Sequence, residues 1–372
     1  MMAGSRRLEP AEPEPMRIES LHACAFRNLA EEPVAFAPGI NLFAGRNGQG
    51  KTSLLEALYC ACYTKSFRTH RLEECVRHGE GEFRLRCRVA RAPLPRVLEV
   101  RVGSAGKELR LDEKAAEVTD FLDTAAILCI TASHLRVITE GPDARRRFFD
   151  GLLVLFRPEY LHRLAAYRRV VRHRNALLRP GAAAAAVLEP WDRKLVLAAR
   201  ALVHHRASFL AELGAADLRD RFSPAAVAVR YAPSLPAELL ADEEAAVAHL
   251  ALHRERELQA GRSLYGPHLD RFDFHLDGCN VRRYASSGQK RSVLLSVYLQ
   301  VMDLYREQRG AFPVVMIDDV DMELDLERLR VLLGHLDAKT QIFLTSSKPE
   351  IFTAMLPACE VFQIEAGGVR KT

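Results

Sequence analysis

The sequence predicts an α/β fold in which an N-terminal and a C-terminal segment flank a mainly helical insert. Short strand-like runs with turn signals fill the N-terminal segment, and two apolar runs in the C-terminal segment, "FPVVMIDD" and "QIFLTSS", are typical of fully buried strands. Between the two segments, apolar residues recur at the three- and four-residue spacing of a helix face. The predicted order is therefore α/β, helical, α/β.

Four parts are expected along the 372 residues. Residues 1–15, "MMAGSRRLEPAEPEP", have no apolar core and are typical of a disordered leader rather than a signal peptide. Residues 16–153 are expected to form the first lobe, residues 154–262 the helical insert, and residues 263–372 the second part of the α/β body.

The first lobe begins with strand patterns. "RIESLHACAFRNL" alternates apolar and polar residues, and "VAFAPGINLFAG" predicts a hairpin that leads into the following loop. "TSLLEALYCACY" predicts an apolar helix. "FRLRCRVAR", "RVLEVRVG" and "KELRLD" then predict short strands, and "AAILCITASHL" predicts a buried strand.

The insert is predicted to contain two helices, each with one apolar seam. Pro180 and Gly181 of "PGAAAAA" interrupt the pattern, so we expect an antiparallel helical hairpin, an arm. A third helical stretch follows in "LLADEEAAVAHLALHRERELQA". The seam positions are Leu161, Leu164, Tyr167, Val171 and Leu178 in the first helix, and Trp191, Leu195, Ala198, Leu202, Phe209 and Leu213 in the second.

Composition excludes some classes of protein. No apolar run approaches the roughly 18 residues that a membrane helix needs, so we expect no membrane partner. The eight cysteines form no CxxC pair and no Cys/His ligand spacing. This usage indicates reduced thiols of a cytoplasmic protein and no metal cluster.

Positive charge is concentrated in one segment. The net charge is +5, but ten arginines stand against Asp150 and Glu159 between residues 144 and 179. Such a cluster favours contact with a polyanion such as nucleic acid. The alternative is a merely solvated face, because the whole chain uses arginine far more than lysine.

"GRNGQGKTS", residues 45–53, carries the pattern GxxxxGK[ST] of a phosphate-binding loop. Glycines let backbone N–H groups turn toward phosphates, the lysine reaches the outer phosphates, and the threonine hydroxyl ligates Mg²⁺. An apolar strand precedes the loop and a helix follows it, as this motif requires. The predicted nucleotide-binding residues here are Gly45, Asn47, Gly48, Gly50, Lys51, Thr52 and Ser53.

"VVMIDDVD" places two carboxylates at the end of an apolar strand. Asp318 is predicted to join Thr52 in holding the metal, and Asp319 to orient or deprotonate a water. Lys51 and Asp319 are thus the predicted catalytic residues. Many buried strands end in acidic residues, but this one follows a phosphate loop after a long insert. Small-molecule kinases complete their site within a shorter chain, and a wide gap filled by a helical arm is the layout of SMC-type ATPases.

"YASSGQKRS" precedes a long predicted helix. Ser286, Gly288 and Gln289 combine a hydroxyl, a glycine backbone and a helix N-terminus, a set that suits an anion. The alternative is an ordinary N-cap. With both nucleotide motifs present, the stretch resembles the ABC-type signature loop, which contacts a γ-phosphate held by the other subunit of a dimer.

Several further stretches, taken in order, resemble the RecF family of bacterial recombination-mediator ATPases from about residue 16 to near the end. They are "AFRNL", "GRNGQGKTSLLEALY", "KSFRTHRLEECVRHG", "GPDARRRFFDGLL", "YRRVVRHRNALL", "GRSLYGPHLDRF", "YASSGQKRS", "VMIDDVDMELD" and "QIFLTSS". The resemblance implies an ABC-type P-loop ATPase head, built from the N- and C-terminal segments, with an inserted mainly helical arm domain. It also implies ATP and Mg²⁺ as cofactors.

The same resemblance implies a function in DNA replication, DNA repair and the SOS response. The expected protein dimerises on ATP, binds double-stranded and gapped DNA, and assists RecA loading with RecR and, indirectly, RecO. Its ATPase is expected to be weak and DNA-stimulated, with slow hydrolysis releasing the DNA.

Carried over to this chain, the resemblance implies that Ser286 and Gly288 act in trans on the partner subunit's nucleotide. Asp325 would close the loop that crosses to the partner's site, and Thr345 would lie beside the γ-phosphate. Met322 stands where the family usually has serine or alanine, and "GPHLDR" lacks the arginine that commonly follows the histidine. These departures motivate an alternative, a RecF-like scaffold that binds nucleotide statically and docks partner proteins.

Five arginines are candidate DNA contacts. Arg145 and Arg146 open a helix after "GPD", where intramolecular ion pairing is the alternative to phosphate contact. Arg168, Arg172 and Arg179 are predicted to lie along one side of the first arm helix, an arrangement that suits a phosphate backbone. His268 of "YGPH" is interpreted as a hydrogen-bonded turn residue rather than a catalyst.

Overall fold

The structure is a computed structural model, and it describes residues 16–91, 93–131, 136–179, 187–215, 218–323, 325–336, 339–356 and 358–372. The expected leader, residues 1–15, and the predicted Pro-Gly link between the arm helices, residues 180–186, lie outside the described residues.

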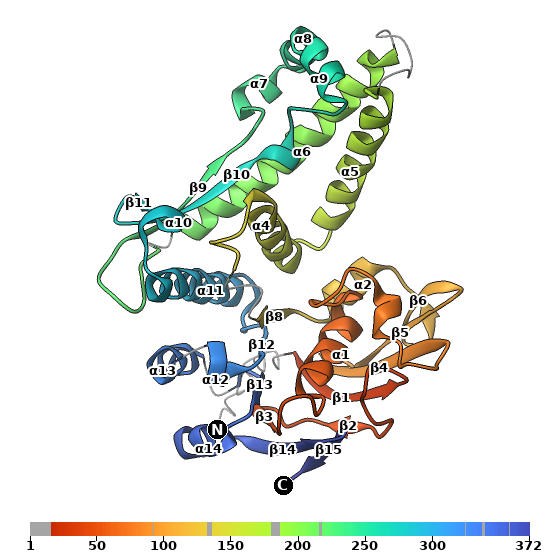
Figure 1. The fold of residues 1–372 in the computed structure, drawn as a ribbon, viewed down its shortest axis with the longest axis vertical. Helices are drawn as coiled ribbons and strands as arrows, with labels where there is room; N and C mark the ends of the chain where they lie inside the picture. Colours follow the sequence, from red (N-terminus) through yellow and green to blue (C-terminus); the bar gives the residue numbers. More distant parts are fainter. Residues whose placement is uncertain are drawn as a thin grey trace, which may run out of the picture. The chain divides into compact units, whose positions relative to one another are not determined.

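The chain divides into two compact units (Figure 1). Unit 1 comprises Met1–Ile127, Arg306–Met316 and Asp337–Thr372, and unit 2 comprises Leu128–Tyr305 and Ile317–Leu336. Unit 1 thus joins the first lobe to the C-terminus of the chain. The signature loop and the acidic residues after "VVMI" belong to unit 2. The predicted α/β class with a helical insert is confirmed.

A six-stranded sheet joins strands from both ends of the chain in the order β15-β14-β3-β13-β12-β8. At its centre β3 pairs in parallel with β13 on one side and with β14 on the other. Parallel strands of this kind are buried on both faces and therefore read as continuous apolar runs. The strands are β3 (Ile40–Ala44), β8 (Ile127–Ile130), β12 (Val314–Ile317), β13 (Ile342–Ser346), β14 (Glu360–Glu365) and β15 (Gly368–Lys371).

The predicted hairpin in "VAFAPGINLFAG" is wrong. Its first half is β2, Val34–Ala35, which pairs antiparallel with β1, whereas its second half is β3 of the other sheet. The turn between them is held by the side chain of Asn41, which accepts a hydrogen bond from Ala37 N–H at 2.8 Å and donates to Gly39 O at 2.9 Å. Local alternation could not reveal that each half pairs with a different sheet.

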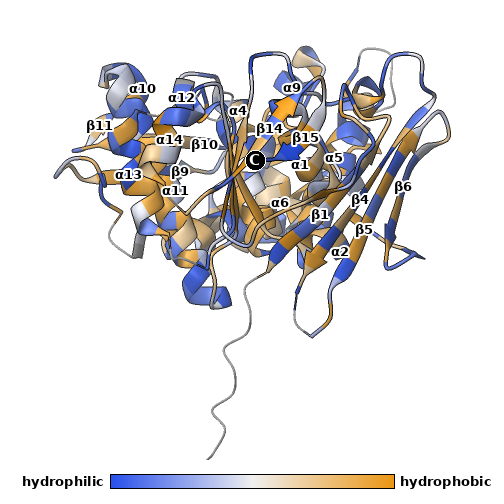
Figure 2. Cartoon of the chain, turned by 90° about the horizontal axis from the view of Figure 1, so that it is seen from below, coloured by the Kyte–Doolittle hydropathy of each residue, from blue (hydrophilic) through white to orange (hydrophobic). Residues whose placement is uncertain are grey.

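Unit 1 also contains an antiparallel sheet, with strand order β2-β1-β4-β5-β6-β7. Along β4 exposed and buried residues alternate strictly, and Figure 2 shows the matching alternation of hydrophilic and hydrophobic bands. Helix α1, Lys51–Tyr63, packs against this sheet and against β13, which explains why it is apolar on nearly every side. The remaining elements are β1 (Arg17–Cys24), β4 (Glu82–Ala90), β5 (Arg96–Gly103), β6 (Gly106–Leu111), β7 (Lys114–Ala115), η1 (Leu72–Cys75), α2 (Val118–Thr124) and α14 (Pro349–Met355).

Unit 2 is mainly helical. The two predicted arm helices are present as α5, Tyr160–Leu177, and α6, Glu189–Ala215, which pack against each other. Seam residues including Leu164, Tyr167 and Leu195 are buried. The third helical stretch is broken into α7 (Ala237–Ala241), α8 (Glu243–Leu252) and α9 (Arg254–Ala260).

The other helices of unit 2 are α4 (Pro142–Phe156), α10 (Val281–Tyr284), α11 (Ser287–Arg309, whose last turn enters unit 1), α12 (Val320–Glu323) and α13 (Leu326–His335). A small sheet, β11-β10-β9, and the short helix η3 also belong to the described part of the unit. Their bounds are Val227–Ala232 for β9, Pro267–Leu269 for η3, Arg271–Leu276 for β10 and Cys279–Asn280 for β11.

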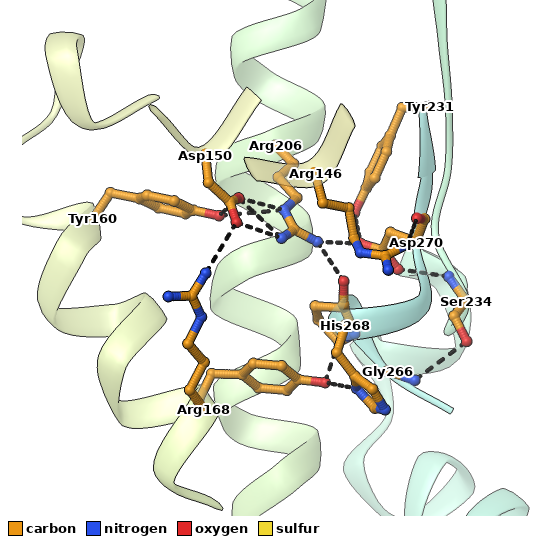
Figure 3. A network of polar contacts seen from close by, with 12 residues as sticks. Arg146, Asp150, Tyr160, Arg168, Arg206, Tyr231, Ser234, Gly266, His268 and Asp270 are labelled. Atoms are coloured by element: carbon orange, nitrogen blue, oxygen red, sulfur yellow. Dashed lines mark hydrogen bonds and ion pairs between the residues drawn. The ribbon is translucent and has the colours of Figure 1, made fainter. Parts of the chain in front are cut away.

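A buried ionic network centred on Arg206 ties the helices of unit 2 to β10 (Figure 3). From α6, Arg206 donates to Asp150 Oδ1 of α4 at 2.9 Å and to Asp270 Oδ2, just before β10, at 2.7 Å. Tyr160 O–H donates to Asp150 at 2.7 Å, and Tyr231 O–H donates to Asp270 at 2.5 Å. The charged side chains are at most 7% exposed. Each buried carboxylate therefore has both a cation and a neutral donor.

The "YGPH" stretch extends this network. Tyr167 O–H lies 2.6 Å from His268 Nδ1, while His268 Nε2 lies 3.2 Å from the carbonyl oxygen of Ser263. Because a carbonyl can only accept, Nε2 carries the ring proton and Nδ1 accepts from tyrosine. Gly266 has φ of 129°, and a Cβ there would collide with the Tyr167 hydroxyl. The interpretation of His268 as a turn residue agrees with this geometry.

A second hub lies further along α5. Arg174 is fully buried and donates to Asp192 Oδ1 at 2.8 Å, to Glu257 Oε2 at 2.5 Å and to Ser263 Oγ at 2.9 Å. It joins α5 and α6 to α9 and to the segment before "YGPH". The "HRNALL" stretch therefore contributes to the packing inside the unit as well as to its surface.

Replacing Arg206 by methionine is expected to destabilise the protein by about 3–5 kcal/mol, because it leaves Asp150 and Asp270 buried without a cation. The control is Leu197→Met, at an exposed position on the same helix, with an effect within about 0.5 kcal/mol. Urea unfolding of both variants measures the difference. Equal midpoints for the two variants would contradict the role given to Arg206.

Candidate nucleotide-binding site

The phosphate loop connects β3 to α1 in unit 1. Its glycines have the conformations that this turn requires: φ is 80° at Gly48 and 115° at Gly50, the N-cap of α1. At Gly45 a Cβ would lie 2.5 Å from the carbonyl oxygen of Ile364. Side chains at these positions would strain or displace the loop, so the glycine spacing is a steric requirement.

The C-terminal hairpin and the "AFRNL" stretch hold the loop in place. Gln49 accepts from Gly367 N–H at 2.9 Å through its backbone carbonyl and from Ala366 N–H at 2.7 Å through its side chain. Ala30 N–H donates to Gly367 O at 2.9 Å. A Cβ at Gly367 would collide with the carbonyl of Asn28. Residues from both ends of the chain therefore shape the loop.

Lys51 lies at the start of α1 with its ammonium folded into the loop. Its Nζ donates to Gly45 O at 2.8 Å and to Arg46 O at 3.2 Å, and the residue is 4% exposed. A buried ammonium held by backbone carbonyls suits an anionic ligand at the mouth of the loop. The lysine is thus positioned by backbone geometry rather than by an acidic side chain.

The neighbouring predicted residues lie on the same support. Thr52 is half-buried in the first turn of α1 and Ser53 is buried behind it. Thr345 is fully buried in β13, where its Cα pairs with Phe43 of β3. Asn47 Oδ1 lies 3.5 Å from Lys51 Nζ. All of these belong to unit 1.

Glu56, one turn further along α1, was not identified from the sequence. Its carboxylate is fully buried and accepts from Arg27 at 2.8 and 3.1 Å, from Arg68 at 3.0 Å and from Ser66 at 2.5 Å. Burial alone would raise the pKa of Glu56, but the hydrogen bonds from Arg27 and Ser66 lower it overall. The signal that the sequence offered was an arginine in each of "AFRNL" and "KSFRTH", two stretches to which no role had been assigned. These residues, Arg27 and Arg68, both contact the helix that carries Lys51.

Asp318 and Asp319 follow β12 and belong to unit 2. Asp318 is 8% exposed, and its N–H donates to Ile130 O at 3.1 Å. Asp319 has φ of 47°, a left-handed conformation that is uncommon outside glycine and better tolerated by aspartate and asparagine than by most residues. Strained backbone of this kind clusters at functional sites. The first of the two carboxylates is thus buried and the second sits on a sharp turn.

Ser286, Gly288 and Gln289 form the N-terminus of α11 in unit 2. Gln289 N–H donates to Ser286 Oγ at 3.2 Å, and Ser286 N–H donates to Gln289 Oε1 at 2.9 Å. This reciprocal pair is a capping box. The N-cap alternative is therefore correct as local structure, and it leaves the exposed Ser286 hydroxyl able to donate its own proton to an acceptor.

Asp325 is the N-cap of α13 and accepts from Arg328 N–H at 2.9 Å. Met322 belongs to α12, and its side chain lies outside what the structure describes. The altered "GPHLDR" stretch is part of the buried network of unit 2, where Asp270 is fully buried.

For Arg145 and Arg146 the geometry favours the intramolecular alternative. Arg145 is 4% exposed, donates to Phe272 O at 2.5 Å and Glu140 O at 2.9 Å, and lies near Asp273. Arg146 donates to Asp270 O at 2.8 Å and contacts Asp143. Both guanidinium groups anchor α4 to the segment around β10.

Arg168, Arg172 and Arg179 are exposed. Arg168 and Arg172 lie one turn apart on α5, whereas Arg179 follows the end of that helix at Leu177. Arg168 is 58% exposed and 4.0 Å from Asp150, an ion pair that water largely screens. Arg169 is also exposed on α5, so the helix presents several guanidinium groups to solvent.

No described helix is long and apolar enough to span a membrane. Within the described ranges, no group of three or more His, Cys, Asp or Glu side chains is arranged to hold a metal ion.

Comparison with known proteins identifies one family over nearly the whole chain. The family model described as RecF/RecN/SMC N terminal domain matches residues 17–370. The DNA replication and repair protein RecF of Myxococcus xanthus is 33% identical over 347 residues, which cover 89% of this chain and 91% of that protein. RecF of Geobacillus thermodenitrificans is 30% identical over 368 residues, covering 95% and 99%.

Solved structures agree. The recombination mediator protein RecF in the RecFOR pathway, with ATPrS, has a TM-score of 0.87 and 26% identity, covering 97% of this chain and 99% of that one. The same protein with ATP has a TM-score of 0.88 and 25% identity, covering 98% and 100%. An Smc head bound to the C-winged helix domain of ScpA, with a TM-score of 0.51 and 14% identity, shares the fold alone.

Replacing Glu56 by glutamine is expected to cost about 2 kcal/mol of unfolding free energy, because three charge-assisted hydrogen bonds from two arginines are weakened. The pKa of this carboxyl is lowered in the folded state, so its contribution is present above the ordinary value of 4.5 and is lost as the pH falls through the lowered pKa. Denaturant titrations between pH 3 and 7 measure the difference between wild type and variant, which should shrink toward acid. Glu73→Gln, at an exposed position, is the control; a Glu56→Gln loss independent of pH would contradict this account.

Proposed function

Because the chain belongs to the RecF family, we propose that it is an ATP-dependent DNA-binding clamp of DNA replication and recombinational repair. The observation that carries the proposal is the phosphate loop, shaped by both ends of the chain with Lys51 at its mouth. In this proposal ATP brings two subunits together, the dimer binds duplex DNA at single-strand gaps, and slow hydrolysis releases it. With RecR, and indirectly RecO, the dimer assists RecA loading.

The proposed nucleotide site has two halves. Loop N–H groups and the Lys51 ammonium bind the phosphates of ATP in one subunit, and Thr345 lies beside the γ-phosphate. Ser286 and Gly288 of the other subunit contact that phosphate in trans, with the helix N-terminus of α11 and Gln289 behind them. Asp325 lies in the segment that crosses to the partner's site.

Asp319 is the proposed hydrolytic carboxylate. It orients a water for attack on the γ-phosphorus and accepts the water's proton as a general base. The donor chemistry of Thr52 and Asp318, one hydroxyl and one carboxylate, fits Mg²⁺, which takes few protein oxygens and fills its shell with phosphate and water. When bound, this ion would neutralise charge that develops on the phosphates.

The exposed arginines of α5 and its end, Arg168, Arg172 and Arg179, are the proposed DNA contacts. Such contacts position the duplex without reading its sequence, so binding is directed by shape and weakened by salt. Arg145 and Arg146 contribute by anchoring α4.

The fluorescence anisotropy of a labelled gapped duplex, titrated with protein in ATP, in ADP and without nucleotide, tests whether the nucleotide controls DNA binding. Tight binding is expected in ATP alone. Equal binding in all three states would instead favour the alternative, a scaffold that binds nucleotide statically and docks partner proteins.

Arg168→Gln combined with Arg172→Gln should weaken DNA binding and lower the steepness of the salt dependence by about two, because each phosphate contact contributes about 0.9 to it. The measurement is affinity at several salt concentrations in ATP. Lys194→Gln, at an exposed cation on α6, is the control and should leave the salt dependence unchanged. An unchanged slope in the double variant would exclude Arg168 and Arg172 as DNA contacts.

Lys51→Ala is expected to abolish ATP-dependent dimerisation, whereas Asp319→Asn should trap a DNA-bound dimer. Asparagine tolerates the left-handed conformation at position 319, so the second change removes charge without imposing a backbone cost. Light scattering and filter binding in ATP measure both effects. A dimer that still forms with ATP in the Lys51→Ala variant would contradict the clamp mechanism.

A further inference from the structure

Arg328 lies in the first turn of α13 and reaches across unit 2 to the N-terminus of α11. Its guanidinium donates to Ser292 Oγ through Nε at 3.2 Å and through Nη2 at 2.9 Å, and Nη2 also donates to the carbonyl oxygen of Gly288 at 3.3 Å. Ser292 is 4% exposed. One side chain thus contacts both the glycine of the signature loop and the next turn of its helix.

The same guanidinium pairs with the segment after the two acidic residues. Nη1 contacts the carboxylate of Asp325, and the backbone N–H of Arg328 donates to that carboxylate at 2.9 Å. The guanidinium carbon also lies 5.8 Å from the ring centre of Phe222. The arginine side chain is 23% exposed, so the group is largely enclosed by these partners.

A guanidinium is planar and its five donors point in fixed directions. When one such group bonds to Asp325, Ser292 and Gly288 together, it fixes their mutual distances. A lysine at this position has a single ammonium on a flexible stem and cannot reproduce the fork. The geometry therefore requires arginine rather than a positive charge alone.

We propose that Arg328 is a positioning residue that couples the Asp325 segment to the signature loop, so that the loop meets the γ-phosphate of ATP in a fixed orientation. The inference rests on the proposed function for the identity of that ligand. The coupling itself lies within one unit of one chain and is measurable without nucleotide or dimer.

The first readout is amide hydrogen exchange over residues 286–292 of the full-length protein without nucleotide. In Arg328→Lys, and in Ser292→Ala, exchange over these residues should be roughly ten-fold faster than in wild type, as expected for loss of one coupled contact. Arg330→Ala, at an exposed position on the same helix, should leave exchange unchanged. Unchanged protection in Arg328→Lys would overturn the proposal.

The second readout separates positioning from general damage. Arg328→Lys should bind an ATP analogue as tightly as wild type, because the phosphate loop is untouched, while dimerising roughly ten-fold less well and hydrolysing ATP more slowly. Combining it with Ser292→Ala should add little, because both remove the same contact. Equal losses of analogue binding and dimerisation would indicate a structural role only and would overturn the proposal.

The two hypotheses fail differently. If wild type does not dimerise on ATP, the proposed function is wrong, and faster exchange in Arg328→Lys still supports the coupling of the two segments. If wild type dimerises and Arg328→Lys matches it in both exchange and dimerisation, the coupling is wrong and the proposed function stands.

Discussion

Parallel pairing of β3 with strands from the C-terminal end of the chain is the constraint on which the nucleotide site depends. Residues 40–44 have β13 on one side and β14 on the other, so the phosphate loop that follows β3 forms only when both ends of the chain have met. The turn that closes on Gln49 from Gly367 reinforces the same requirement. Because contacts so distant in sequence must close first, this sheet is an expected slow step of folding.

Local chemistry explains what could be predicted. The glycine spacing of the phosphate loop, the buried strands β12 and β13, and the helices α5, α6 and α11 follow from motifs, apolar runs and periodicity contained in short windows. Ser286 and Gln289 form the capping box that the N-cap interpretation predicts, and the serine hydroxyl stays exposed. The hairpin prediction was wrong because the partners of its two strands lie in different sheets, and no window of neighbouring residues contains that information.

The arginines show most clearly what neighbouring residues in the sequence cannot predict. A count of charge between residues 144 and 179 cannot separate Arg174, fully buried among two carboxylates and a serine, from Arg172, exposed two residues earlier. Burial decides which arginines are available to a polyanion, and burial depends on Asp192 and Glu257, which lie on other helices. The arginines available to a polyanion are therefore those exposed on α5 and just after its end.

The buried arginines and carboxylates also explain why many residues of the quoted motifs are neither catalytic nor ligand-binding residues themselves. Glu56 with its two arginines supports the helix that carries Lys51, and Arg328 supports the loop that carries Ser286. Each support lies within its own unit, so each half of the proposed site is shaped before any partner arrives. In the proposed clamp, nucleotide would therefore only have to join two preorganised surfaces, and little of its binding energy would be spent on ordering either one. The proposed clamp would then close on ATP by forming an interface, without refolding either of its parts.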